Sequence, residues 1–197
     1  SRNKVALGVL VSGRGTNLEA LIDAGLPIAV VVSNVPGAPA LDRAAKAGIP
    51  CAAIDHRAAG SRETFEDAVL GVLEKYGVTH VALAGFMRIL TQRFLGRFPE
   101  RVVNIHPSLL PAFPGVDAQM QAFDYGVKVT GVTIHFVDAG TDTGPIISQE
   151  ALSVREGETG ESLRARLLEV EHRLFPEAVR LFIAGRLQRG GRRVRIG

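Results

Sequence analysis

Strand-like and helix-like segments alternate through the first half of this chain, and this alternation restricts its fold more than any other feature. KVALGVLV at 4–11 is almost continuously apolar and β-rich, which is typical of a strand buried on both faces of a sheet. A helical pattern starts near Asn17 and stops at Gly25, and PIAVVVS at 27–33 is the next strand. Strands separated by helices predict a parallel sheet with helices on both faces.

The same rhythm continues to residue 105 and then changes. Ser61 is placed to cap a helix over RETFEDAVLGVLEKYG, and further strands are predicted at CAAI, VTHVALAGF and RVVNI. Beyond Gly115, VKVTGVTIHFV and GPIISQEALSV are strands joined only by the short link DAGTDT, so they should pair antiparallel. A last helix is expected at about 161–184. We predict one α/β domain over 1–197: a mostly parallel, twisted open sheet with flanking helices and an antiparallel C-terminal edge.

Composition excludes several classes of protein. Of 197 residues, 46% are hydrophobic and 22% charged, as in an ordinary globular domain, and no apolar run reaches the ~18 residues of a membrane span. We interpret the start SRNKVALGVLVSGRG as a first strand, not a signal peptide. The single Cys51 excludes an internal disulfide and favours a reducing compartment. Arginines at 186–195 could contact nucleic acid, but without interleaved aromatic residues a solvated end is favoured.

Ligands of such sheets bind beyond the carboxyl ends of the strands, and SGRGTN at 12–17 follows the first one. Gly13 and Gly15 allow a tight turn, and the N–H groups that begin the next helix suit a phosphate. The third glycine of a dinucleotide fingerprint is missing at Leu18. A mononucleotide-sized ligand is therefore favoured over NAD, and a plain turn remains the alternative.

A rigid segment, NIHPSLLPAFPG at 104–115, follows the fifth predicted strand. Its prolines remove backbone donors, so it can continue neither as a strand nor as a helix. Asn104 and His106 are two residues apart, so in an extended strand end their side chains could project to the same side. An amide and an imidazole together there would stabilise an oxyanion. Most lone histidines are structural. Three others are interpreted in that way: His56, His80 and His172.

The short link DAGTDTGP supplies a third candidate. A carboxylate from Asp142 beside the imidazole would fix its tautomer and favour its charged form. An aspartate that caps its own turn explains Asp142 equally well when it is taken alone.

Together these stretches resemble the phosphoribosylglycinamide formyltransferases, a folate-dependent family of purine synthesis. The resemblance covers SGRGTNL, AGFMRIL, NIHPSLLPAFPG, the D-x-G-P of Asp142 to Pro145, and EVEHRLFP. Methionyl-tRNA formyltransferases share the His-Pro-Ser loop but carry an extra C-terminal domain, for which we expect no room here. Formyltetrahydrofolate deformylases depart from the motif after its histidine. The resemblance implies a Rossmann-like formyltransferase fold.

The resemblance also implies an activity. The formyl group of 10-formyltetrahydrofolate, the co-substrate, would pass to the amine of glycinamide ribonucleotide in de novo purine (IMP) biosynthesis. Asn104 and protonated His106 would stabilise the tetrahedral intermediate, with Asp142 assisting. We expect no metal, no nucleic-acid partner and no membrane. We expect the protein to be cytoplasmic and to be a monomer or a homodimer. The alternatives are a formyltetrahydrofolate hydrolase and a non-catalytic nucleotide-binding module.

Binding residues follow from the same resemblance. Those implied for the ribonucleotide are Gly13, Gly15, Thr16, Asn17, Pro107 and Glu171. Those implied for folate are Arg62, Met87, Arg88, Ile89, Leu90, Asn104, Asp138, Ala139, Gly140, Thr141 and Asp142. The phosphate-binding half would span about 1–100, and the folate-binding and catalytic half about 101–197. Relatives carry a polar residue at Leu168 and histidines at Asp117 and Gln119, so no role is carried over to these three.

One backbone prediction concerns the proline segment. The chain must reverse sharply after His106, neighbouring prolines restrict its alternatives, and the resemblance implies a cis bond. We expect the Leu110-Pro111 bond to be cis, although such bonds are only about 5–6% of X-Pro bonds.

Overall fold

The computed structural model describes residues 4–197, whose contacts divide into two compact units. Unit 1 covers the described residues through Val103, and unit 2 covers Asn104–Gly197. Strand β5 (Val102–His106) begins in the first unit and ends in the second. Across residues 4–197, no helix combines the length and low polarity that crossing a bilayer requires.

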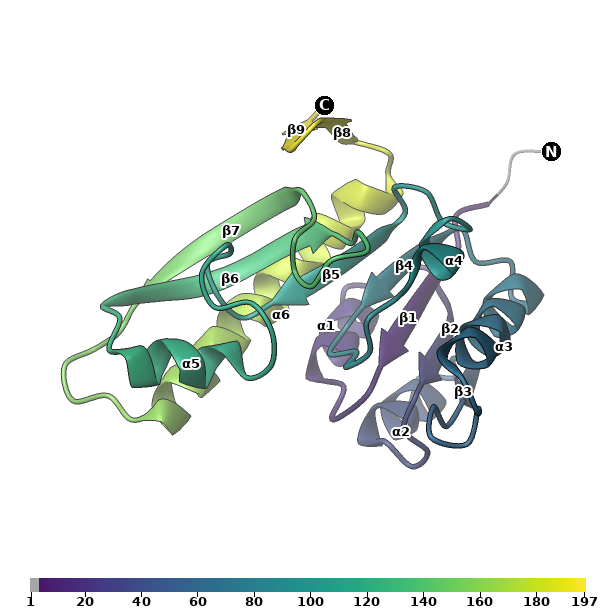
Figure 1. Ribbon diagram of the computed structural model, residues 1–197, viewed down its shortest axis with the longest axis horizontal. Helices are drawn as coiled ribbons and strands as arrows, with labels where there is room; N and C mark the ends of the chain where they lie inside the picture. Colours follow the sequence, from purple (N-terminus) through teal and green to yellow (C-terminus); the bar gives the residue numbers. More distant parts are fainter. Residues whose placement is uncertain (1–3) are drawn as a thin grey trace. The chain divides into compact units, whose positions relative to one another are not determined.

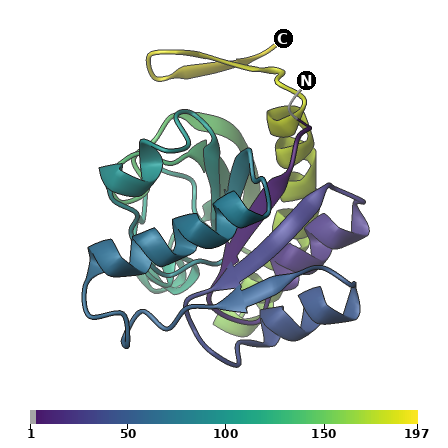
Figure 2. The same cartoon turned by 90° about the vertical axis from the view of Figure 1, so that its right-hand side faces the viewer.

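Unit 1 contains four parallel strands in the order β3-β2-β1-β4, and the start of β5 continues this order beside β4. The strands are β1 (Leu7–Val11), β2 (Ile28–Ser33), β3 (Cys51–Ala53) and β4 (His80–Leu83). The helices are α1 (Thr16–Asp23), α2 (Pro39–Lys46), α3 (Arg62–Lys75) and α4 (Gln92–Leu95). Helices α1 and α2 lie on one face of these strands and α3 on the other (Figures 1 and 2). Every residue of β1 is buried, which confirms the prediction of a two-sided central strand.

Local signals in unit 1 act as the sequence predicts. The Ser61 hydroxyl accepts a hydrogen bond from the Thr64 N–H at 3.0 Å and so caps α3. Gly15 precedes α1 with φ of 80°, and a Cβ built on it would lie 2.6 Å from the Cβ of Ala40. Glycine is therefore required at this position both by the turn and by the packing of α2.

Unit 2 is built on the end of β5, on β6 (Val129–Phe136) and on β7 (Ile146–Ser153). Strands β6 and β7 pair antiparallel, as predicted, and Val132 lies opposite Glu150. Helix α5 (Ala118–Tyr125) packs on α6 (Gly160–Ile183), and α6 packs on both long strands. The strand order β3-β2-β1-β4-β5-β6-β7 confirms a mostly parallel sheet with an antiparallel edge.

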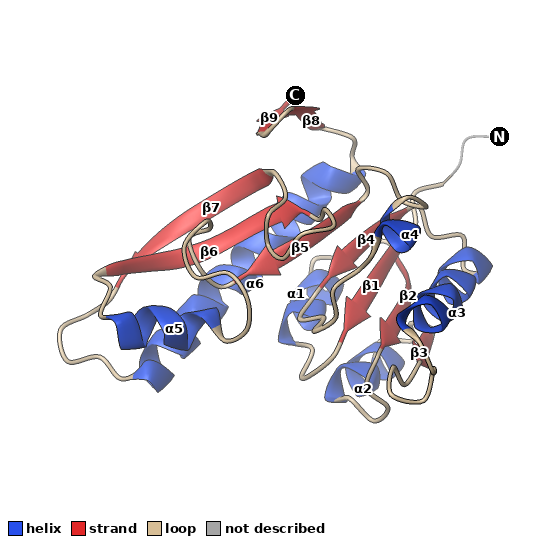
Figure 3. Ribbon diagram, viewed as in Figure 1, coloured by secondary structure: helices blue, strands red, loops and turns tan. Residues whose placement is uncertain are grey.

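A small hairpin that the sequence analysis did not predict follows α6. Strand β8 (Leu187–Gly190) pairs antiparallel with β9 (Arg193–Ile196) and forms a separate two-stranded sheet (Figure 3). The chain turns at Gly191, where φ is 61°. The pair Gly190-Gly191 is a hairpin signal that could have been recognised. We call β8, β9 and their turn the basic hairpin, because it carries Arg189, Arg192, Arg193 and Arg195.

Candidate functional site

The imidazole of His106 lies at the end of β5 with only 5% of the residue exposed. Its Nε2 lies 2.8 Å from the carbonyl oxygen of Phe113, to which an N–H at that position donates. Its Nδ1 faces Asp142, with 3.5 Å between Nδ1 and Oδ2. The carbonyl thus fixes which ring nitrogen is turned toward the carboxylate.

Asp142 lies in the link between β6 and β7 and has an unusual backbone. Its φ is 55°, a left-handed conformation that aspartate tolerates better than most residues. Its Oδ2 accepts a hydrogen bond of 2.8 Å from the N–H of Gly115. The carboxylate therefore ties this link to the last residue of the proline segment, Asn104–Gly115, as well as facing His106.

His135 in β6 is a member of this cluster that the sequence analysis missed. It is 2% exposed, and burial lowers its pKa below the ordinary value. Its Nδ1 lies 2.8 Å from the carbonyl of Phe136, and its Nε2 lies 3.2 Å from Nδ2 of Asn104. A neutral ring that donates through Nδ1 accepts at Nε2, so His135 orients the amide of Asn104. The signal in the sequence was a histidine in an apolar strand directly before DAGTDTGP.

A buried polar network holds the proline segment in place. The Thr133 hydroxyl donates to the Ser108 carbonyl at 2.7 Å and accepts from the Leu110 N–H at 3.1 Å. The side-chain amide of Gln149 donates to the Leu110 carbonyl at 2.9 Å. The Leu110-Pro111 bond is cis, which confirms the prediction. The segment that begins with Asn104 and His106 is thus fixed by β6 and β7 as well as by its prolines.

The link between β6 and β7 continues the site, and we call Asp138–Gly144 the 138–144 loop. Asp138 closes it from within, because its Oδ1 accepts from the Gly140 N–H at 2.9 Å and from the Thr143 hydroxyl at 2.6 Å. The three residues between Asp138 and Asp142 are exposed: Ala139, Gly140 and Thr141. Their exposure leaves room for a ligand beside this loop, and the folate contacts expected here stay a prediction.

In unit 1, the glycine loop (Ser12–Asn17) lies at the carboxyl end of β1. Two of its carbonyls are occupied: Gly13 O accepts from the Ala40 N–H at 3.0 Å, and Arg14 O accepts from Nε of Arg43 at 2.7 Å. The first N–H groups of α1 have no partner within the helix and carry the positive end of its dipole. The loop therefore presents a donor surface that suits an anion.

The predicted folate segment Met87–Leu90 also lies in unit 1 and is fixed at both ends. At its start, the Met87 N–H donates to the Ser12 hydroxyl at 2.8 Å. Just beyond its end, the Thr91 N–H donates to the buried carboxylate of Glu66 at 2.8 Å. Met87 and Ile89 are 61% and 47% exposed, whereas Leu90 is 3% exposed and belongs to the core. Apolar side chains displayed on a fixed segment suit a flat aromatic ligand.

The other predicted residues are placed as follows. Arg62 is exposed at the start of α3, Arg88 and Pro107 are half-buried, and Asn17 and Glu171 are buried. Asp117, to which no role was carried over, forms an ion pair of 3.0 Å with Arg164. Leu168 is half-buried in α6. None of these placements by itself assigns a ligand.

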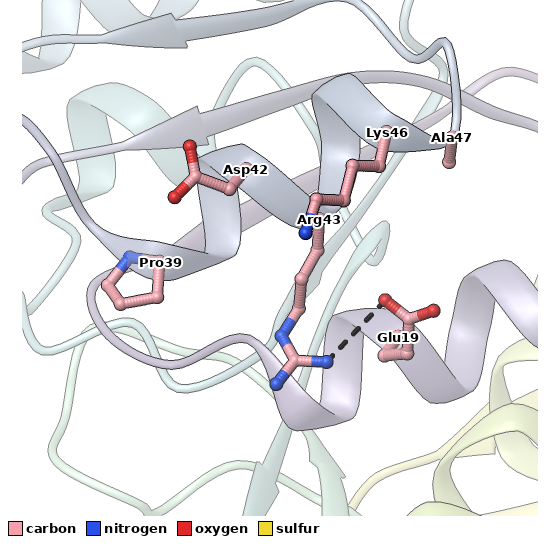
Figure 4. Close-up of a pocket in the computed structure, with 6 residues that line it drawn as sticks. All are labelled: Glu19, Pro39, Asp42, Arg43, Lys46 and Ala47. Atoms are coloured by element: carbon pink, nitrogen blue, oxygen red, sulfur yellow. Dashed lines mark ion pairs between the residues drawn. The ribbon is translucent and has the colours of Figure 1, made fainter.

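A surface hollow of about 590 Å³ lies elsewhere in unit 1, along α1 and α2 (Figure 4). It is lined by Glu19, Pro39, Asp42, Arg43, Lys46 and Ala47. Arg43 reaches Glu19 across it, with 3.6 Å between Nη1 and Oε2. The hollow contains no predicted site residue, and charges of both signs line it. Among residues 4–197, no group of three or more histidine, cysteine, aspartate or glutamate residues could hold a metal ion.

Comparison with known proteins connects this geometry to a family. The model of the formyl transferase family matches residues 4–179. The phosphoribosylglycinamide formyltransferase of Bacillus subtilis is 40% identical over 87% of this chain and 91% of its own length. A solved structure, glycinamide ribonucleotide transformylase 1 from Symbiobacterium toebii, is 51% identical with a TM-score of 0.95, over 100% of this chain and 95% of that one.

Longer relatives match as well. The trifunctional purine biosynthetic protein adenosine-3 of Gallus gallus is 48% identical over 95% of this chain, which spans only 19% of that protein. The sequence motifs, the order of the strands and these matches agree. This chain therefore belongs to the formyl transferase family, and within it to the phosphoribosylglycinamide formyltransferases.

Proposed function

We propose that this chain transfers the formyl group of 10-formyltetrahydrofolate to the primary amine of glycinamide ribonucleotide, a step of de novo purine biosynthesis. The observation that carries the proposal is the cluster at the end of β5. His106 faces Asp142 across 3.5 Å, and Asn104 is oriented by a neutral His135. An imidazole, a carboxylate and a fixed amide can supply the proton transfers and the oxyanion stabilisation that favour acyl transfer through a tetrahedral intermediate.

In the proposed mechanism, the amine nitrogen attacks the formyl carbon, a C–N bond forms, and the carbonyl electrons move to oxygen. The Asn104 amide and the protonated imidazole of His106 stabilise this oxyanion. The intermediate then collapses and breaks the bond between the formyl carbon and N10 of the folate. One proton leaves the attacking amine and one reaches N10, so the overall reaction consumes no proton.

The roles of the two ring nitrogens follow from their contacts. Nε2 of His106 is occupied by the Phe113 carbonyl, so Nδ1 is the position from which a proton would reach the substrate. Asp142 stabilises a proton at Nδ1 and, through ordered water, accepts the proton that the amine loses. Burial lowers the pKa of His135, so its neutral ring orients the Asn104 amide; its Nε2 also lies 3.8 Å from Oδ1 of Asp142.

The substrates are assigned to different parts of the chain. The glycine loop, with Thr16 and Asn17, would bind the ribonucleotide phosphate at the start of α1. Glu171 would bind the ribose hydroxyls, and Pro107 would line the ribonucleotide site. Folate would contact Met87–Leu90 and the 138–144 loop, and Arg62 its glutamate tail. The cytoplasmic location and the monomeric or dimeric state remain predictions.

A substrate-omission experiment tests this function. The protein is mixed with both substrates, with each substrate alone, and with the ribonucleotide lacking its amine, and tetrahydrofolate and formylated product are measured. We expect tetrahydrofolate to form only with the complete ribonucleotide and in equal amount to the formylated product. Tetrahydrofolate released without the amine would identify a hydrolase, and no turnover in any mixture would indicate a non-catalytic nucleotide-binding module.

A further inference from the structure

The basic hairpin is attached to the 138–144 loop by one arginine. Nη1 of Arg192 donates to the carbonyl of Thr143 at 2.7 Å, and its Nη2 donates to the carbonyl of Gly144 at 3.3 Å. These are the two carbonyls that directly follow Asp142 in the chain. A guanidinium presents its donors in a fixed planar fork, so two bonds to neighbouring carbonyls set the direction of that backbone.

A second arginine of the hairpin reaches the other end of the same loop. The guanidinium of Arg189 lies over the ring of Phe136, 4.9 Å from its centroid. Phe136 is the last residue of β6, and its N–H donates to the Pro145 carbonyl at 2.9 Å. Strand β9 also contacts β7. The hairpin is thus attached where the loop leaves β6 and where it returns to β7.

The loop depends on outside contacts for its conformation. Asp142 is left-handed at φ of 55°, a backbone conformation that costs a residue other than glycine on the order of 1 kcal/mol or more. Asp138 holds the loop through bonds from Gly140 and Thr143, and neither bond involves the carbonyl group of Gly144. That carbonyl accepts a hydrogen bond from Arg192. Because the Gly144 carbonyl is fixed, the Asp142 carboxylate can point in fewer directions.

We propose that the basic hairpin is part of the active site and that Arg192 is a positioning residue for Asp142. Through the Thr143 and Gly144 carbonyls, Arg192 keeps the carboxylate on the Gly115 N–H and in front of His106. The arginine-rich end of the chain then has a role in catalysis, without contact between Arg192 and substrate. The catalytic consequence rests on the proposed function, but the structural one does not.

The test compares Arg192→Ala, in the turn of the hairpin, with Arg193→Ala, which removes the same charge from the next residue, the first of β9. Hydrogen exchange of peptides covering 137–145, followed by mass spectrometry, reports on the loop in the substrate-free protein. In Arg192→Ala the exchange should be about 5- to 10-fold faster, the effect of losing roughly 1 kcal/mol of hydrogen bonding. Arg193→Ala should exchange like the unmodified protein. Arg192→Lys keeps the charge and one bond, so it should fall between the two.

Kinetics supply the second measurement. Displacing Asp142 should lower kcat for formyl transfer by up to about tenfold with little change in KM for the ribonucleotide. Unchanged loop exchange in Arg192→Ala, or equal acceleration in Arg193→Ala, would overturn the inference. If loop exchange accelerates but the unmodified protein transfers no formyl group, the proposed function fails and the positioning role of Arg192 stands.

Discussion

The two units hold the residues proposed for function in different ways. In unit 1 these are backbone N–H groups at the start of α1 and a short segment after β4, and both follow parallel strands. In unit 2 they are mostly buried side chains beside irregular backbone. Among residues 4–197, four non-glycine residues have positive φ, and three of them lie in unit 2: Phe113, Asp117 and Asp142.

This difference shows which changes each unit should tolerate. A site made of backbone is insensitive to many side-chain substitutions but fails when the turn itself cannot form. A site made of buried polar side chains fails when a single functional group is lost, because a partner is then left unsatisfied. Substitutions in the two units should therefore differ in what they damage: binding and folding in unit 1, and chemistry in unit 2.

The largest effect is expected for His106→Ala. Loss of the proton donor and of its charge should lower kcat by about 100- to 1000-fold, while the fold persists. His80→Gln is the matched control, because His80 is also buried but lies at the amino end of its strand. Steady-state assays on both variants, with circular dichroism to check folding, make the comparison. Near-normal turnover in a folded His106→Ala protein would remove the imidazole from the mechanism.

In the glycine loop, Gly15→Ala should act through the backbone. Its Cβ would meet Ala40 at 2.6 Å in a left-handed turn, so we expect a loss of about 2–3 kcal/mol in the free energy of unfolding. A higher KM for the ribonucleotide should accompany it. Gly13→Ala is the control, because no atom lies within 4 Å of its added Cβ. Urea titrations that find the two variants equally stable would contradict the account of this turn.

Asp142→Asn should have a smaller effect of another kind. The amide keeps an oxygen that can accept from the Gly115 N–H but loses the charge opposite His106. Without the carboxylate, the proton that the amine loses has no acceptor at this position, so kcat should be about tenfold lower at neutral pH with little change in KM. An unchanged kcat in a folded Asp142→Asn protein would exclude the carboxylate from the proton transfers.

The smallest effect concerns pH and stability in unit 1. Burial, with help from Arg101, lowers the pKa of His80 from 6.5 to about 4. The unfolded chain therefore takes up this proton first as the pH falls, so the stability that neutral His80 contributes is present above pH 6.5 and is lost toward about pH 4. Unfolding free energies measured across this window should fall more for the unmodified protein than for His80→Gln. Parallel curves would show that His80 is not the group responsible.

The sequence predicted unit 1 better than unit 2, for a physical reason. The elements of unit 1 follow from local pattern: a continuous apolar run for β1, and Ser61 three residues before Thr64 for the cap of α3. In unit 2 the motif residues could be named, but their partners could not. His135 lies in a strand buried on both faces, where alternation gives no signal about the side to which it points.

Two other contacts depend on tertiary structure alone. Phe113 binds His106 through its carbonyl, and a backbone acceptor has no residue signature. Arg192 lies nearly 50 residues after the Thr143 carbonyl that it binds, in a tail for which the sequence favoured a solvated end over a nucleic-acid contact. Side-chain identity points to a catalytic group more readily than to the backbone group that orients it.

The fate of a labelled formyl group distinguishes transfer by His106 from hydrolysis in a single experiment. Enzyme in excess is mixed with formyl-labelled 10-formyltetrahydrofolate and glycinamide ribonucleotide, and a single turnover is quenched over time for the unmodified protein and for His106→Ala. We expect all of the label to move to the ribonucleotide amide and none to formate, about 100- to 1000-fold more slowly in the variant. Label recovered as formate, or transfer at the same rate in a folded His106→Ala protein, would contradict this expectation.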